Sequence, residues 1–140
     1  MIPNTRELIP GSKYFTWHEA LYLKSINSYA IPTELQKITI SNFAKKMDRI
    51  RDHFGLPIKV HSWLRPDLYN KMIGGAAGSL HCEGRAIDFS IPGGSSIEEI
   101  KRVLYSDKNL WPGRGELDTT DWVHLDDSMG PWFYGNPKRV

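Results

Sequence analysis

A long amphipathic segment after Pro32 constrains the fold of this 140-residue chain more than any other feature. Its apolar residues recur at three- and four-residue spacing, which is typical of a helix with one buried face. They are Ile40, Phe43, Ala44, Met47, Ile50 and Phe54. Gly55 follows where a C-terminal cap belongs, because glycine adopts the left-handed conformation at little cost. We therefore expect a scaffold helix that faces the core and ends before Gly55.

Three shorter helices are predicted around this one. Thr16 and Glu19 form a capping box that opens a helix reaching about Ser25. A helical turn is expected over Pro66–Ile73, and Ser95 or Ser96 can cap a helix with a buried apolar face. The residues of that face are Ile97, Ile100, Val103 and Leu104.

Short strands are predicted mainly in the second half of the chain. The range Arg85–Ile91 alternates between apolar and polar residues, with Ile87 and Phe89 on one face and Asp88 on the other. Further strands are expected over Pro57–Ser62 and Asp121–Asp126. Early helices followed by short strands favour an α+β fold. We expect a single domain over residues 1–140, in which a small antiparallel sheet carries a polar site on one face and packs helices on the other.

Composition narrows the class of protein. With 40% hydrophobic residues and a net charge of +2, the chain is ordinary for a globular protein and lacks the concentrated basic patch of a nucleic-acid binder. No apolar stretch approaches a membrane span, and the N-terminus lacks the pattern of a signal peptide. The single cysteine, Cys82, excludes an internal disulfide. We expect a monomer made in a cytoplasm, without a nucleic-acid or membrane partner, which must be released if it acts outside.

His81 and Asp88 have the chemistry of zinc ligands. Zinc in proteins binds imidazole nitrogen and carboxylate oxygen in a tetrahedron at about 2.0–2.2 Å. The two residues are seven positions apart, so on a helix they would lie about 10 Å apart along the axis, too far to share one ion. A reversal at Gly84 would bring them together, since glycine permits the required backbone conformation. Asp88 would then leave the strand opposite the apolar face.

His124 is the best candidate for a third ligand. It shares a strand face with Trp122 and Asp126, whereas Val123 and Leu125 point to the core. Three protein ligands leave the fourth position open, which distinguishes a catalytic zinc site from a closed structural one. The pattern therefore predicts one zinc ion per chain and hydrolysis assisted by that metal.

The motif Ser-x-His-x-x-Gly-x-Ala-x-Asp over Ser79–Asp88, with an acidic residue three positions before His124, resembles a known family of zinc peptidases. These are the D-alanyl-D-alanine peptidases and L-alanyl-D-glutamate endopeptidases of peptidase family M15, which have the Hedgehog/DD-peptidase fold. The resemblance covers about residues 58–126. It includes Ser62-Trp63-Leu64-Arg65, Tyr69-Asn70 and Gly74-Gly75-Ala76.

The resemblance implies roles for individual residues. His81, Asp88 and His124 match the metal ligands of the family, and Asp121 matches its catalytic carboxylate. Arg65 matches the arginine that steadies the substrate carbonyl or the oxyanion, a role that suits a permanently charged guanidinium. Ser79 is expected to support the site or to contact substrate, and Asp126 to orient an imidazole from the second shell of the metal.

The catalytic acid departs from the family pattern. The family commonly has Glu where this chain has Asp121, which is shorter by one methylene. On an ideal strand Asp121 and His124 would point to opposite faces, so Asp121 must lie in a turn or bulge before the strand. Asp118 and Glu116 are the alternative acids.

The resemblance implies a metallopeptidase that acts on peptidoglycan or its peptide fragments. A cell-wall endopeptidase, such as a phage endolysin, is the first hypothesis. A D,D-carboxypeptidase or dipeptidase acting on D-alanyl-D-alanine is the second, and a non-catalytic zinc-stabilised binding or virion protein is the third. Which peptide bond is cut, and in which organism, does not follow from the sequence.

Overall fold

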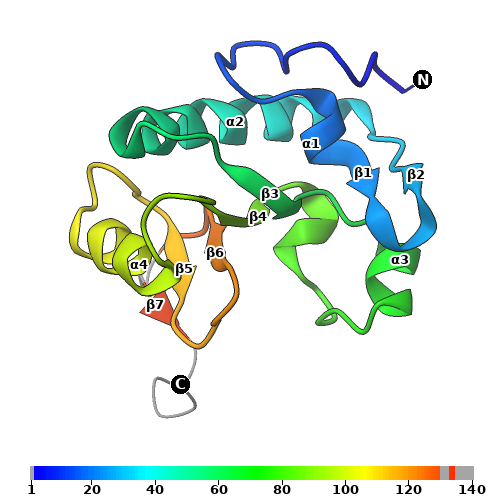
Figure 1. Cartoon of the computed structure of the whole chain (residues 1–140). Helices are drawn as coiled ribbons and strands as arrows, with labels where there is room; N and C mark the ends of the chain where they lie inside the picture. Colours follow the sequence, from blue (N-terminus) through cyan, green and yellow to red (C-terminus); the bar gives the residue numbers. More distant parts are fainter. Residues whose placement is uncertain (1, 130–132, 135–140) are drawn as a thin grey trace.

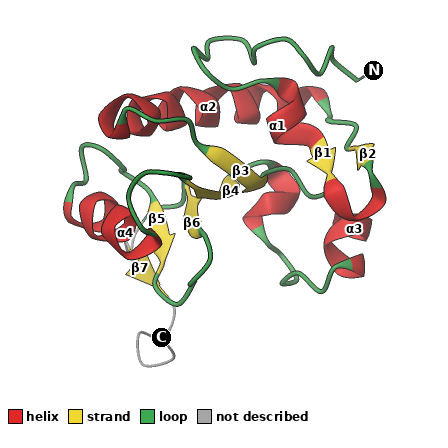
Figure 2. Ribbon diagram, viewed as in Figure 1, coloured by secondary structure: helices red, strands yellow, loops and turns green. Residues whose placement is uncertain are grey.

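The computed structural model describes residues 2–129 and 133–134 (Figures 1 and 2). The helical elements of this part are α1 (Trp17–Leu21), η1 (Lys24–Ile26), α2 (Glu34–Phe54), α3 (Asp67–Met72), η2 (Leu80–Glu83) and α4 (Ile97–Ser106). Its strands are β1 (Tyr22–Leu23), β2 (Ser28–Tyr29), β3 (Lys59–Ser62), β4 (Ala86–Ser90), β5 (Arg114–Glu116), β6 (Val123–Asp126) and β7 (Phe133–Tyr134). In this part no helix is both long enough and apolar enough to span a membrane. The predicted α+β class is confirmed.

The scaffold helix expected after Pro32 is α2, which runs along one side of the sheet (Figure 1). Thr33 caps it through a capping box with Gln36, and Gly55 ends it in the left-handed conformation at φ 74°. The five expected apolar residues from Ile40 to Ile50 are fully buried, and Phe54 packs partly buried against them. The main core lies between this helix and the sheet.

The larger sheet has the strand order β3-β4-β6-β5-β7. The predicted antiparallel pairing is confirmed for β3 with β4, β4 with β6 and β6 with β5. The outer strand β7 departs from it by pairing parallel to β5. Both β5 and β7 run antiparallel to β6, because the chain reverses direction between β6 and β7. The neighbouring strands β5 and β7 are therefore parallel to each other.

The polar and apolar faces of the sheet follow the alternation seen in the sequence. In the pairing of β4 with β6, Ile87 lies opposite Leu125 on the core face. Asp88 lies opposite His124 on the other face. The strands are shorter than predicted: β4 is Ala86–Ser90, and β6 begins at Val123 rather than at Asp121.

The first predicted helix is too long. Its capping box at Thr16 is present, but α1 ends at Leu21 and the chain then enters the β1–β2 hairpin. The two strands are connected by η1 and by Asn27, which ends η1 in the left-handed conformation at φ 45°. Pairing between the two strands replaces helical hydrogen bonds, and a helix that continued to Ser25 would forgo that pairing. In the later helices, Pro66 is the N-cap of α3, and Ser96 is the N-cap of α4.

Gly84 makes the reversal that the sequence required between His81 and Asp88. It ends η2 in the left-handed conformation, with φ 78°, and its N–H bonds back to the carbonyl of His81. A side chain at this position would also lack space, since a Cβ atom would lie 2.9 Å from Cγ1 of Ile40. Both constraints select glycine here.

We predict that Gly84→Ala lowers the free energy of unfolding by about 2–4 kcal/mol, because it adds overpacking to the strain of a left-handed residue. Gly55→Ala is the matched control: Gly55 has a similar φ of 74°, but a Cβ atom there meets nothing within 4 Å. Denaturant unfolding of both variants measures the difference. Equal losses of stability would show that the contact with Ile40 does not constrain the reversal.

Candidate metal centre

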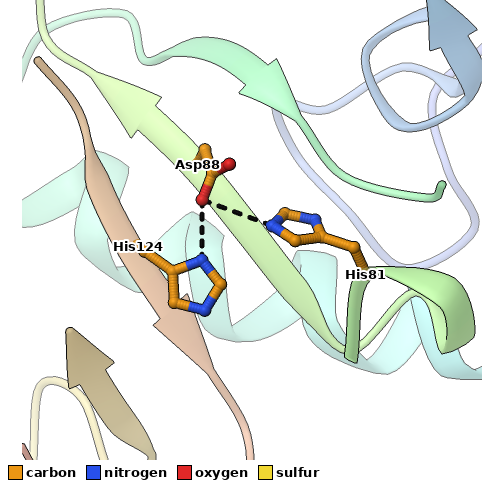
Figure 3. A group of neighbouring side chains, drawn as sticks. All are labelled: His81, Asp88 and His124. Atoms are coloured by element: carbon orange, nitrogen blue, oxygen red, sulfur yellow. Dashed lines mark hydrogen bonds and ion pairs between the residues drawn. The ribbon is translucent and has the colours of Figure 1, made fainter. Parts of the chain in front are cut away.

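Three side chains from separate elements converge on the polar face of the sheet (Figure 3). Asp88 comes from the middle of β4, His124 lies opposite it on β6, and His81 comes from η2. One potential ligand atom of each residue lies within 4.8 Å of those of the other two. The structure thus brings together the three residues that were predicted from the sequence as zinc ligands.

The chain before β4 fixes the position of His81. Ser79 caps η2 by accepting a hydrogen bond from the backbone N–H of His81. The carbonyl of His81 accepts from the backbone N–H of Arg65 at 2.9 Å, and its Nδ1 lies 2.7 Å from the carbonyl oxygen of Trp63. Because a carbonyl can only accept, Nδ1 of His81 must carry the proton.

The remaining nitrogen of His81 provides the test of whether a metal fits. With the proton on Nδ1, Nε2 presents a lone pair, and burial favours this neutral form by lowering the pKa of His81. Nε2 is buried and has no hydrogen-bond partner, although it lies 3.3 Å from Oδ1 of Asp88. A lone pair facing a carboxylate oxygen in a buried site is unfavourable unless a cation lies between them. Two imidazoles and one carboxylate are also the donor types that zinc prefers.

Asp88 supplies the negative charge of the centre. Burial alone would raise its pKa, but its hydrogen bond with His124 and its electrostatic interactions with both histidines outweigh burial and lower it. Its Oδ1 lies 2.7 Å from Nδ1 of His124, and its Oδ2 lies 3.6 Å from Nη2 of Arg65. Asp88 is therefore held ionised, as a metal ligand must be.

Arg65 is held against this centre by α3 and the loop that follows it. Its Nη1 donates to Oδ1 of Asn70, and Nδ2 of Asn70 donates to the carbonyl of Ala76. Gly75 leaves the space for this arrangement, since a Cβ atom there would lie 2.0 Å from Oδ1 of Asn70 and 3.0 Å from Nη1 of Arg65. These contacts account for the Asn70 and Gly75 elements of the sequence motif.

Asp126 has a different partner from the one expected. It is fully buried and forms a two-point ion pair with Arg114, whose Nε and Nη2 each lie 3.0 Å from a carboxylate oxygen. Its distance to Nε2 of His124 is 3.9 Å, which is beyond a hydrogen bond. The sequence analysis missed Arg114, because its place opposite Asp126 depends on the pairing of β5 with β6, which no local pattern in the sequence indicates. An orienting role for Asp126 toward His124 stays a prediction.

Two carboxylates compete for the role of proton carrier. Asp121 lies in a bend directly before β6, as the sequence required, and lines a cleft with Asp88 and Arg65. Glu116 ends β5, and continuing the β5–β6 register places it opposite His124 on the metal face. The pKa of Glu116 is raised mainly by burial and also by a hydrogen bond with Asp118.

Three hollows form a row past the metal centre. The first, of about 330 Å³, contains the three ligands, Glu116 and the 76–80 loop, and we call it the metal cleft. The second, of about 460 Å³, shares Arg65, Asp88 and Trp122 with it. The third, of about 390 Å³, shares Tyr22, Lys24 and His61 with the second. The metal face thus adjoins a groove rather than a closed pocket.

We predict that the protein binds one zinc ion and that His124→Ala abolishes this binding, because two ligands cannot hold the metal. His61→Ala is the matched control, since His61 lies in the second hollow but outside the ligand cluster. Metal content after gel filtration measures the stoichiometry. Zinc at a thousandfold excess over its Kd should also stabilise wild type by about 4 kcal/mol in thermal unfolding. Full zinc occupancy in His124→Ala would contradict this site.

Comparison with known proteins agrees with this geometry. A sequence model of the family described as Peptidase M15 matches residues 14–126, well over half of the chain. The matched range includes the three ligands, Arg65 and both candidate acids. Neither curated proteins nor solved structures gave a significant match. On the strength of the family match, the chain belongs to the peptidase M15 family.

Proposed function

We propose that the chain is a zinc-dependent endopeptidase that hydrolyses peptide bonds in the stem peptides of peptidoglycan. The observation that carries the proposal is the set of three ligands, His81, Asp88 and His124, beside a groove that can admit a substrate. Three protein ligands leave a coordination position for water, as catalytic zinc sites do. Membership of the peptidase M15 family supports both the reaction and the substrate class.

The side chains around the centre have the chemistry for peptide hydrolysis. Zinc in such a site supplies the polarisation of a carbonyl and the acidification of a water molecule. Arg65 points a guanidinium toward the centre, 3.6 Å from Asp88, where it can stabilise charge that develops on the scissile carbonyl oxygen. A carboxylate beside the centre accepts the proton of the attacking water and passes it to the departing amine.

The groove favours cleavage within a peptide over removal of a terminal residue. Arg65, Asp88 and Trp122 line both the metal cleft and the second hollow, so the space at the centre continues beyond the metal cleft. A carboxypeptidase or dipeptidase would need a closed pocket around a free C-terminal carboxylate. We therefore rank the D,D-carboxypeptidase activity second and the non-catalytic binding protein third.

We assign the proton transfer to Asp121 rather than to Glu116. Asp121 shares the second hollow with Arg65, and Glu116 shares the metal cleft with it, so both acids can approach a scissile bond near Arg65 and another property must separate them. Burial, and then its neighbour Asp118, raise the pKa of Glu116, which disfavours the ionised carboxylate that must accept a proton from water. Asp121 lies two residues before the strand that carries His124.

The test of the function is cleavage of purified muropeptides and of D-alanyl-D-alanine by the zinc-loaded protein. We expect wild type to cleave muropeptides at an internal bond, and His124→Ala to be inactive because it cannot hold zinc. Mass spectrometry of the products identifies the bond. Cleavage of the dipeptide alone would favour the second hypothesis. A zinc-loaded wild type that cleaves neither substrate would contradict the proposed enzyme.

The test of the acid compares two isosteric variants of the zinc-loaded protein. Asp121→Asn should lower kcat by about 10²–10⁴-fold, the usual contribution of general acid–base catalysis, and Glu116→Gln should lower it by less than this. Zinc content, measured alongside, separates a chemical defect from loss of metal. The reverse order of the two effects would move the proton transfer to Glu116.

A further inference from the structure

The groove continues from the metal centre across β3 to the edge formed by α1 and β1. Its second and third hollows share Tyr22, Lys24 and His61, which makes them one continuous space. Lys59 lines the outer end of this space. We call the part lined by these four residues the β3 arm. It lies beyond the catalytic centre, so only an extended substrate would reach it.

The two lysines of the β3 arm form no ion pair with a carboxylate of the described residues. Among the described residues, no Asp or Glu lies within ion-pairing distance of Lys24 or Lys59. Glu19 is the acid at the outer end, and its Oε1 accepts hydrogen bonds from the backbone and side chain of Thr16 in the capping box. The lysine charges are therefore available to a bound anion.

His61 lies where the fields of both lysines overlap. Its Nε2 is 2.7 Å from Oγ of Ser90, which fixes the ring on the floor of the arm. Burial lowers the pKa of His61, and the charges of Lys59 and Lys24 lower it further. Lys24 lines the second and third hollows with His61, and Lys59 lines the third with it, so both lysines border the same space.

Lys24 lies nearest to the reaction, because it lines the hollow that also contains Asp88 and Arg65. The β1–β2 hairpin holds it there: the neighbouring backbone N–H of Ser25 donates to the hydroxyl of Tyr69 on α3. The Lys24 side chain itself has no hydrogen bond in the described part of the chain and is exposed. It is free to close on a ligand.

We propose that Lys24, supported by the charge of Lys59, binds a free carboxylate of the substrate and so determines specificity. The substrate class is a peptide that carries an ionised carboxylate on the segment lying in the β3 arm, and the amidated form of that peptide is a poorer substrate. This inference rests on the proposed peptidase function and adds to it a charge requirement remote from the scissile bond.

The experiment measures kcat/KM of the zinc-loaded protein on two muropeptides that differ only in having free or amidated carboxylates. Wild type should prefer the free acid. Lys24→Gln should reduce that preference about fivefold, as expected for the loss of one partly exposed ion pair, and Lys24→Arg should retain it. Lys71→Gln is the matched control, because Lys71 is an exposed lysine of α3 outside all three hollows of the groove. Thermal unfolding confirms that each variant is folded.

The outcomes separate this inference from the function on which it rests. Equal rates of wild type on the acid and the amide, or an unchanged preference in Lys24→Gln, would overturn the carboxylate site and leave the peptidase in place. A wild type that cleaves neither peptide would overturn the proposed function and this inference with it. A loss of preference in Lys24→Gln that Lys24→Arg restores supports the role of the charge.

Discussion

The pairing of β4 with β6 is the constraint on which the metal centre depends. Ile87 and Phe89 lie opposite Leu125 and Val123, and burial of this apolar face fixes the register. A slip of one residue would move every side chain to the other face, so the register that buries the core also places Asp88 beside His124. The hydrophobic core and the polar site are therefore two consequences of one strand pairing.

The position of the third ligand, His81, does not follow from the pairing of β4 with β6. A fully buried imidazole needs a partner for each ring nitrogen, and the carbonyl of Trp63 serves only one nitrogen of His81. Trp63 is itself buried, and its indole N–H donates to the carbonyl of Gly84, which ties the reversal to the core. A bound metal would satisfy the other nitrogen of His81, which would couple metal binding to folding in this segment.

The sequence predicted the features that follow from periodicity and from single special residues. The face of α2, the alternation of β4, the reversal at Gly84 and the position of Asp121 before β6 all have local causes. The end of α1 at Leu21 was missed, because pairing of β1 with β2 overrides helical propensity. The contact of His81 with the carbonyl of Trp63 involves a backbone group, so no sequence pattern indicates it. The position of Glu116 opposite His124, which distinguishes it from Asp118, depends on the pairing of β5 with β6.

The proposed zinc site is open and is made of two imidazoles and one carboxylate. X-ray absorption at the zinc edge tests it most directly, because the spectrum reports the type and number of atoms bound to the metal. We predict that two imidazole nitrogens and oxygen donors bind the metal and that no sulfur does. Cys82 is adjacent to His81 but lies outside the ligand cluster. A zinc–sulfur distance of about 2.3 Å would contradict it, because that distance would mean that the thiol completes a closed structural site.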